Sequence, residues 1–422
     1  MARTDHRRQR HPATIPVYFD QLETITQRFH EQRSLGLIFI DVFSRAGMSR
    51  PYDQQVRDEL VRYLERLILD MRGALIRKDD LITVNHAGHE HFLIFLGKKR
   101  EHRPFFPSDL ESLRDRIARH LDEQLMKFRA SVPMACPRVK VGHAIALHSP
   151  IVKEEQAVIQ LIEDGKKMAD YYEFRQRMRV KEKLQELIFK EQIRTLYQPI
   201  VELGTNIVFG YEALSRGPAG TEFESPAALF EMASESGLLA ELDRVCSGRA
   251  VHNATGLPPE ARLFINVLPA TVYEPGFNAA QLKEFFSRHG IDPHRVVVEI
   301  SEREAITNFD RFRAAMARFN GLGFAVAIDD VGTGYANLDL VVELQPAFMK
   351  IDLMMVRQID RHPLKQELIR SIVGLARRIG SKVIAEGIET AEERDTITAL
   401  GVEYGQGYLF GRPGLPFPSI AR

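Results

Sequence analysis

The chain has 422 residues, which is roughly two or three domains' worth and excludes a single small core. Lys plus Arg is 57 and Asp plus Glu is 57, so 57 − 57 leaves no net charge, which argues against a protein that binds a nucleic-acid polymer through overall charge. With 44% hydrophobic and 27% charged residues, wholesale disorder is excluded. Two cysteines and no apolar run near the roughly 18 residues of a membrane helix predict a cytoplasmic protein without a membrane span.

The first half predicts a compact α/β domain. Residues 1–32 are expected to form a tail and a helix, and residues 33–153 the domain itself. The expected strands are 35–41, 81–84, 92–96 and 138–147, and the expected helices are 54–71 and 109–128. The second and third of these strands flank a polar turn and predict a hairpin.

A long helical pattern follows, with apolar residues at three- and four-residue spacings over 154–193. We assign 154–191 as a connecting helix in which Gly165 is the one weak point. Such a helix joins two domains or pairs with its copy in a homodimer. The alternative is a surface helix packed on its own domain.

Residues 192–422 repeat strand and helix patterns. The strand candidates are 195–201, 207–212, 262–266, 296–299, 324–329, 348–351, 382–386 and 402–406. Eight such units in about 230 residues predict a TIM-like (β/α)8 barrel. The three residues 204–206 are too few for a parallel crossover, so the first strand should run antiparallel to the second.

Polar residues close most of these apolar strands. They are Glu212, Asn266, Glu299, Asp329, Asp330, Lys350, Glu386 and Gln406. The carboxyl ends of barrel strands meet at one mouth, where active sites are built. A ring of carboxylates is costly unless cations offset the repulsion, and oxygen ligands suit Mg²⁺ or Mn²⁺. Two cations can stabilise the attacking and leaving oxygens in phosphoryl transfer, which favours a metal-dependent hydrolase of a phosphate ester.

Eight short motifs follow one another in this half. They are YQPI at 197–200, YEALSR at 211–216, FIN at 264–266, EISE at 299–302, DDVGTGY at 329–335, KID at 350–352, EGIE at 386–389 and QGY at 406–408. In sequence and in order they resemble the motifs of EAL-domain cyclic-di-GMP phosphodiesterases. The resemblance covers essentially all of 192–422 and implies hydrolysis of cyclic-di-GMP to linear pGpG.

The resemblance also implies roles for individual residues. The two ions, Mg²⁺ or Mn²⁺, would be held by Glu212, Asn266, Glu299, Asp329, Asp330 and Glu386. The other expected catalytic or supporting residues are Lys350, Glu389 and Glu302, with Glu302 steadying the loop after Asp330. Substrate-binding positions would be Gln198, Leu214, Arg216 and Gln406, and a guanidinium suits a phosphate because it makes two-pronged contacts.

Four positions depart from the family pattern, and none is an expected metal ligand. They are Leu268, Val331, Ala336 and Asn337. The change at Ala336 removes a hydroxyl partner of Glu302, so we expect activity that is slow or conditional.

The first half has GHEHF at residues 88–92, in the turn of the expected hairpin, and Asp41 at the end of its first expected strand. With the order of its elements, this resembles a degenerate GGDEF domain, the diguanylate cyclase module. GHEHF stands at the position of that signature, and Asp41 matches one metal aspartate while the second is missing. We therefore expect a regulatory domain without synthetic activity. Arg77 and Asp80 have the spacing of a product-binding motif but stand two residues too far from the hairpin.

His86, His89 and His91 could bind a metal ion at the hairpin, since residues i and i+2 of a strand share a face. Histidines in a polar turn are the simpler interpretation. For the whole chain we expect a phosphodiesterase, dimeric and open to a protein partner through its N-terminal domain. The rivals are a non-catalytic cyclic-di-GMP receptor and a scaffold that binds no nucleotide.

Overall fold

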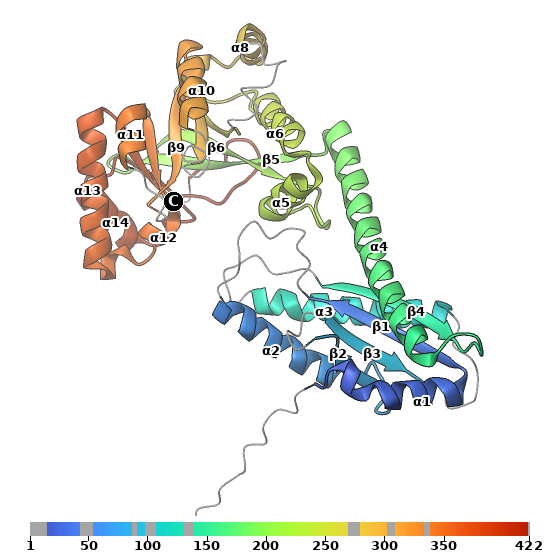
Figure 1. The fold of residues 1–422 in the computed structure, drawn as a ribbon. Coiled ribbons are helices and arrows are strands. Elements are labelled where there is room, and N and C mark those ends of the chain that lie inside the picture. Colours follow the sequence, from blue (N-terminus) through green and yellow to red (C-terminus); the bar gives the residue numbers. More distant parts are fainter. Residues whose placement is uncertain are drawn as a thin grey trace, which may run out of the picture. The chain divides into compact units, whose positions relative to one another are not determined.

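The computed structural model describes residues 15–42, 54–86, 91–97, 107–129, 139–268, 279–301, 309–332 and 338–420. The chain forms two compact units, one up to Arg179 and one from Val180 onward. The division falls inside one continuous helix, α4 (Glu154–Phe189). Each unit has its own hydrophobic core, and each is an α/β structure (Figure 1).

The first unit is built on a four-stranded sheet of order β2-β3-β1-β4. Its strands are β1 (Ser34–Asp41), β2 (Leu81–Val84), β3 (His91–Leu96) and β4 (Lys140–Leu147). Its other elements are η1 (Tyr18–Gln21), α1 (Leu22–Gln32), α2 (Gln54–Asp70) and α3 (Pro107–Arg129). All three strand pairs are antiparallel, so the predicted hairpin of β2 and β3 is confirmed.

Side-chain alternation along β1 explains why helices cover both faces of this sheet. Leu37 and Phe39 pack with α1 and the first half of α4, whereas Ile38 and Ile40 pack with α2 and α3. Successive strand residues point to opposite faces, so a strand buried on both sides is apolar throughout.

Helix α4 runs unbroken through Gly165, the position expected to weaken it. A Cβ on Gly142 of β4 would lie 2.1 Å from the Gly165 carbonyl oxygen, and a Cβ on Gly165 would lie 2.9 Å from Leu37 Cδ2. The two glycines therefore let the helix backbone approach the sheet closely, and that packing compensates the low helix propensity of glycine.

The second unit contains a closed eight-stranded barrel of order β10-β11-β12-β5-β6-β7-β8-β9. The strands are β5 (Arg194–Glu202), β6 (Ile207–Arg216), β7 (Arg262–Asn266), β8 (Val296–Ser301), β9 (Ala325–Val331), β10 (Phe348–Ile351), β11 (Lys382–Ala385) and β12 (Tyr404–Gln406). Strand β5 pairs antiparallel with both β6 and β12, as predicted for the first strand, and the other six pairs are parallel. Asn206 at φ 57° helps to close the β5–β6 turn.

Helices follow most of the barrel strands. The longer ones are α5 (Pro226–Ser236), α6 (Leu239–Asn253), α8 (Ala279–Arg288), α10 (Phe309–Gly321), α13 (Pro363–Ile379) and α14 (Ala391–Ala399). Shorter ones are η2 (Pro293–Arg295), α11 (Leu338–Leu344), α12 (Leu353–Val356) and η3 (Ile359–Arg361). None of the described helices combines the length and apolar character needed to cross a bilayer.

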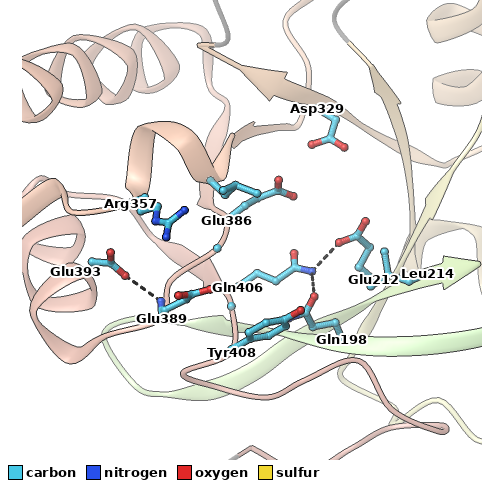
Figure 2. Close-up of a pocket in the computed structure, with 13 residues that line it drawn as sticks. Gln198, Glu212, Leu214, Asp329, Arg357, Glu386, Glu389, Glu393, Gln406 and Tyr408 are labelled. Atoms are coloured by element: carbon cyan, nitrogen blue, oxygen red, sulfur yellow. Dashed lines mark hydrogen bonds between the residues drawn. The ribbon is translucent and has the colours of Figure 1, made fainter. Parts of the chain in front are cut away.

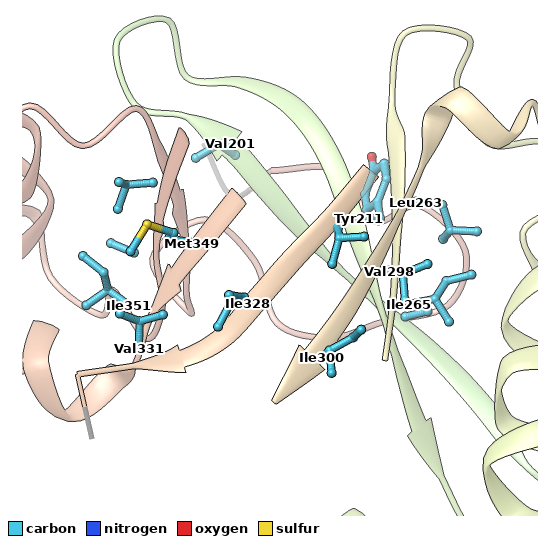
Figure 3. Close-up of a cluster of buried hydrophobic side chains, with 14 of the residues drawn as sticks. Val201, Tyr211, Leu263, Ile265, Val298, Ile300, Ile328, Val331, Met349 and Ile351 are labelled. Atoms are coloured by element: carbon cyan, nitrogen blue, oxygen red, sulfur yellow. The ribbon is translucent and has the colours of Figure 1, made fainter. Parts of the chain in front are cut away.

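The main core of this unit joins outward-facing strand residues to the surrounding helices. Leu263 and Ile265 of β7 and Val298 of β8 belong to it (Figure 3). Helix residues such as Phe319 and Ile372 complete it. A separate apolar cluster fills the barrel interior. The barrel is therefore a packed core on both sides of its wall, as expected of this architecture.

Candidate active site

Two layers of side chains fill the barrel interior, and they are offset by two residues along each strand. Phe264, Val297 and Phe348 belong to the interior apolar cluster. Asn266, Glu299 and Lys350 stand two residues further on in the same strands. Residues i and i+2 share a strand face, so an apolar layer closes the barrel beneath a polar layer.

Lys350 lies at the centre of the polar layer and is fully buried. Its Nζ is 2.6 Å from a carboxylate oxygen of Glu386, 2.9 Å from Glu299, 3.4 Å from Asp329 and 3.6 Å from Glu212. These residues come from five different strands or strand ends, so the barrel brings them together as the sequence predicted. A buried ammonium in contact with four carboxylates is a strong local concentration of charge.

Amide side chains link this charged group to its surroundings. Asn266 Nδ2 donates to Glu212 Oε1 at 3.1 Å and to Glu299 Oε2 at 3.2 Å. Gln406 Nε2 donates to Glu212 Oε2 at 2.6 Å and to Gln198 Oε1 at 3.0 Å (Figure 2). Glu212 therefore accepts hydrogen bonds on both of its oxygens, which fixes its orientation.

The pKa values of three carboxyl groups in this layer are shifted in different directions. Burial opposes ionisation of Glu212, yet Lys350 and the amide donors outweigh it, so its pKa is lowered. Burial and the nearby Glu212 hold the pKa of Glu299 well above its usual range. Burial also raises the pKa of Glu386 to about 8, although Lys350 opposes the shift. The group thus carries more acid than one lysine neutralises.

The donor set fits hard divalent cations. Ligand oxygens of Asp329, Asp330 and Glu386 all lie within 4.8 Å of one another. The ring has five carboxylates, those of Glu212, Glu299, Asp329, Asp330 and Glu386, and one ammonium. When all five carboxylates are ionised, 5 − 1 leaves four negative charges, which two divalent cations would balance, and carboxylate oxygen is the ligand that Mg²⁺ and Mn²⁺ prefer.

Two details of this donor set depend on the backbone and on amide orientation. Asp330 has φ 62°, and its N–H donates to Asp329 Oδ1 at 2.9 Å, which helps to fix the orientation of the Asp329 carboxylate. Asn266 faces the carboxylates with its nitrogen, so it would ligate a cation only after its amide turned over.

Two cavities open beside the polar layer. One, of about 380 Å³, is lined by Glu212, Asp329, Glu386 and Gln406 and extends to Arg357, Glu389 and Tyr408 (Figure 2). The other, of about 400 Å³, is lined by Arg216, Asp243, Asn266 and Glu299, with apolar residues such as Phe230. Leu214 lines both. All four predicted substrate positions, Gln198, Leu214, Arg216 and Gln406, line at least one cavity.

The sequence interpretation was wrong on where some strands end. Strand β6 continues four residues beyond Glu212, and β8 continues two beyond Glu299. The antiparallel partner β5 extends the β6 ladder to the Arg194–Arg216 pair, so Glu212 lies within the strand. Glu302, Ala336 and Asn337 fall outside the described residues, as does His89.

Three cavity residues escaped the sequence interpretation. Asp243 is a buried carboxylate on α6, and its Oδ2 accepts from the Leu268 N–H at 3.2 Å. Arg357 and the buried Glu393 line the first cavity. The available signal for Asp243 was its spacing, because it stands three residues before Cys246 and seven before Ala250, on the buried face of α6. The other two sit among ordinary charged positions.

In the first unit, the residues compared with the GGDEF motifs make local contacts with their neighbours. Asp41 ends β1 opposite His91, with 3.9 Å between carboxylate oxygen and Nε2. Asp80 accepts a hydrogen bond from the Arg77 N–H at 2.8 Å, so this pair forms a local turn. Burial raises the pKa of the Asp80 carboxyl.

A polar cluster at the start of α4 was not anticipated. Glu154 Oε1 lies 3.0 Å from His30 Nδ1 and 3.1 Å from His148 Nε2, and these contacts lower the pKa of Glu154 to about 2. Arg33 Nη1 lies 2.9 Å from His148 Nδ1. Since arginine can only donate, Nδ1 of His148 accepts from Arg33, and His148 donates from Nε2 to Glu154. These hydrogen bonds link the ends of α1 and β4 to the start of α4.

A closed barrel whose mouth holds an acidic ring around one lysine is a TIM-like barrel with polar side chains at the mouth where such barrels build their active sites. The family model for the EAL domain matches residues 181–413, so the chain belongs to the EAL-domain family.

Relatives and solved structures agree with this assignment. The chain is 23% identical over 416 residues to the bifunctional diguanylate cyclase/cyclic di-GMP phosphodiesterase MucR of Pseudomonas aeruginosa, covering 93% of this chain and 58% of the relative. It is 37% identical over 152 residues to the probable cyclic di-GMP phosphodiesterase PdeA of Escherichia coli, covering 36% of this chain and 21% of the relative. It thus spans less than two thirds of the length of these relatives. The crystal structure of the Xanthomonas citri FimX EAL domain with c-diGMP shares its fold, with TM-score 0.54, 23% identity and coverage of 59% and 99%.

Proposed function

We propose that this protein hydrolyses one phosphodiester of cyclic-di-GMP to give linear pGpG, with two Mg²⁺ or Mn²⁺ ions. The observation that carries the proposal is the buried Lys350 within 3.6 Å of four carboxylates, next to two cavities of nucleotide size. The relatives named for cyclic di-GMP phosphodiesterase activity support the substrate assignment.

The residues of the ring divide the work of hydrolysis. Bound divalent cations would supply positive charge that polarises the phosphodiester and lowers the pKa of water. Lys350 keeps its charge because neighbouring carboxylates hold its pKa well above the usual range despite burial, and it offsets negative charge that develops on the phosphoryl group. Glu386, whose carboxylate contacts Lys350, would hold a cation or orient the attacking water. One P–O bond is broken by water, which leaves a terminal phosphate and a free hydroxyl.

The substrate would lie across the mouth of the barrel. Arg216 lines the second cavity and offers a guanidinium to a phosphate. Gln198 and Gln406 are joined by a hydrogen bond beside Glu212 and support the ring. Glu389 lines the outer part of the first cavity. Glu302 keeps its proposed role in steadying the loop after Asp330.

The first unit would regulate the barrel as a degenerate GGDEF domain. Asp41 ends its strand as expected, but Val42-Phe-Ser-Arg45 offers no second acid to hold a nucleotide-bound cation. We extend the proposal to a cytoplasmic homodimer with an input or protein partner at this unit.

Incubation with cyclic-di-GMP and either Mg²⁺ or Mn²⁺, followed by chromatography for pGpG, tests the proposal. Formation of pGpG by the protein and its loss in Glu212→Ala is the expected result, since Glu212 joins the ring to both amide donors. Binding of cyclic-di-GMP without turnover in either cation would instead identify a non-catalytic receptor. Absence of binding would refute both.

A further inference from the structure

Arg357 projects from the turn after α12 into the first cavity. The side chain is exposed, and it makes no hydrogen bond or ion pair with the residues that the structure describes. In Figure 2 it lies beyond Glu386, on the side away from Glu212 and Asp329. A guanidinium has five N–H donors, so an unpaired one facing a cavity is a ready site for a ligand with paired acceptors.

The backbone that carries Arg357 is held on three sides. Asp352 Oδ1 caps α12 by accepting from the Met354 N–H at 2.7 Å. Lys365 Nζ donates to the Arg357 carbonyl oxygen at 2.9 Å. Gln358, at φ 56°, donates its N–H to Glu393 Oε1 at 2.8 Å. Exposed loops rarely have this many fixed points, so the arginine is presented from a rigid base.

Glu393 connects this turn to the loop that carries Glu386. Its Oε2 accepts from the N–H groups of Glu389 at 2.9 Å and Thr390 at 3.2 Å, while Oε1 holds Gln358. The side chain is only 5% exposed. One buried carboxylate thus holds the backbone of the loop that follows Glu386 and the backbone of Gln358 beside Arg357, which makes Glu393 a positioning residue for both segments.

The cavity around Arg357 has the character of a base-binding pocket. Leu353 and Tyr408 line it, and both expose large apolar surfaces. The Tyr408 ring is braced by Arg412, whose guanidinium carbon lies 4.1 Å from the ring centroid. A nucleotide whose phosphate sits at the ring would extend a base in this direction, and aromatic faces suit a base.

We propose that Arg357 binds one guanine of the substrate by donating two hydrogen bonds to its O6 and N7 acceptors. The inference rests on the proposed function, because it assumes a guanine dinucleotide at the ring. Arginine paired with O6 and N7 is the commonest specific contact to guanine, whereas adenine presents a donor in place of O6. Arg357 therefore selects guanine over adenine at this end of the site.

Binding and turnover of cyclic-di-GMP and of its 7-deaza analogue, which lacks the N7 acceptor, test the inference. Binding is measured by calorimetry in Ca²⁺ and turnover in Mg²⁺ or Mn²⁺. For cyclic-di-GMP, Arg357→Ala should weaken binding and raise KM by about 5- to 150-fold with kcat changed little, as expected for one two-pronged contact. The wild type should lose affinity on the 7-deaza analogue, while Arg357→Ala should bind both ligands alike.

Arg361→Ala is the matched control. Arg361 lies on η3 in the same turn region, is 77% exposed in its side chain and pairs with Asp360 outside the cavity lining. It should behave as wild type. Unchanged binding in Arg357→Ala overturns the inference. The inference is also overturned if the wild type and Arg357→Ala lose the same affinity on changing from cyclic-di-GMP to the 7-deaza analogue. That result would indicate that the arginine contacts a phosphate instead. If the wild type binds but does not cleave, the proposed hydrolysis fails while the binding arm still decides on Arg357.

Discussion

Replacement of Lys350 by methionine tests the electrostatic account of the ring most directly. The ammonium is fully buried, and at an effective dielectric of about 20 each of its contacts at 2.6–3.6 Å represents roughly 5–6 kcal/mol of gross attraction. Desolvation and repulsion among the acids offset most of this. Removing one partner of a buried charge pair typically destabilises by about 3–5 kcal/mol, which we expect here.

The loss should depend on pH, and Glu212 sets the sign. Lys350 keeps the pKa of Glu212 below its ordinary value of 4.5 against the effect of burial. Without the lysine, burial raises that pKa above the unfolded value, so the folded variant holds a proton that the unfolded chain releases. Stability then falls as pH rises, by up to about 1.4 kcal/mol per pH unit for each such group. The variant should be closest to wild type near pH 5 and furthest from it near pH 8.

Thermal and urea unfolding with chelator present measure the effect. A loss of about 3–5 kcal/mol corresponds to roughly 6–20 °C in the melting of the second unit. Lys190→Met is the control, because Lys190 forms a solvent-exposed pair with Glu186 whose loss should cost under about 0.5 kcal/mol. A loss for Lys350→Met that is equal at pH 5 and pH 8, or no larger than the control, would refute the reasoning.

Three further predictions concern the rest of the site. Binding of Mg²⁺ or Mn²⁺ near pH 7.5 should release protons, because the pKa of Glu386 is about 8 and a ligating carboxylate must be ionised. Calorimetry in buffers of different ionisation enthalpy measures the number of protons released. If no proton is released, Glu386 is not a ligand of the cation. Glu393→Ala should lower the free energy of unfolding by about 1–2 kcal/mol or more and raise KM, since three backbone N–H groups lose their acceptor. An unchanged KM would show that Glu393 does not position the site. Asp243→Asn should raise KM while keeping the fold, because Asn retains the acceptor for the Leu268 N–H; unchanged steady-state kinetics would remove Asp243 from the substrate site.

Much of the fold was predictable because its signals are local. Strand patterns in 192–422 are short apolar runs, and the short 204–206 connection required an antiparallel first strand, which is what β5 and β6 form. The two-residue offset between Phe348 and Lys350 is likewise written in the chain. It places an apolar layer below a polar one once the strands close into a barrel.

The rest required tertiary contacts. The length of β6 beyond Glu212 depends on pairing with β5, and no local pattern marks it. Asp243, Arg357 and Glu393 reach the cavities from helices or turns whose charged residues resemble any solvated face. Their importance comes from what lies opposite them, which sequence spacing does not encode.

The sequence by itself determined the chemistry of the acids, the order of the strands and the zero net charge of the chain. Only the tertiary structure decided that four carboxylates contact a fully buried lysine and that the carboxylate of Asp330 lies beside two of them. The physical reason is that ionisation and cation affinity depend on burial and on distances of a few ångströms, and barrel closure sets both. A chain that is neutral overall thus concentrates negative charge at one mouth.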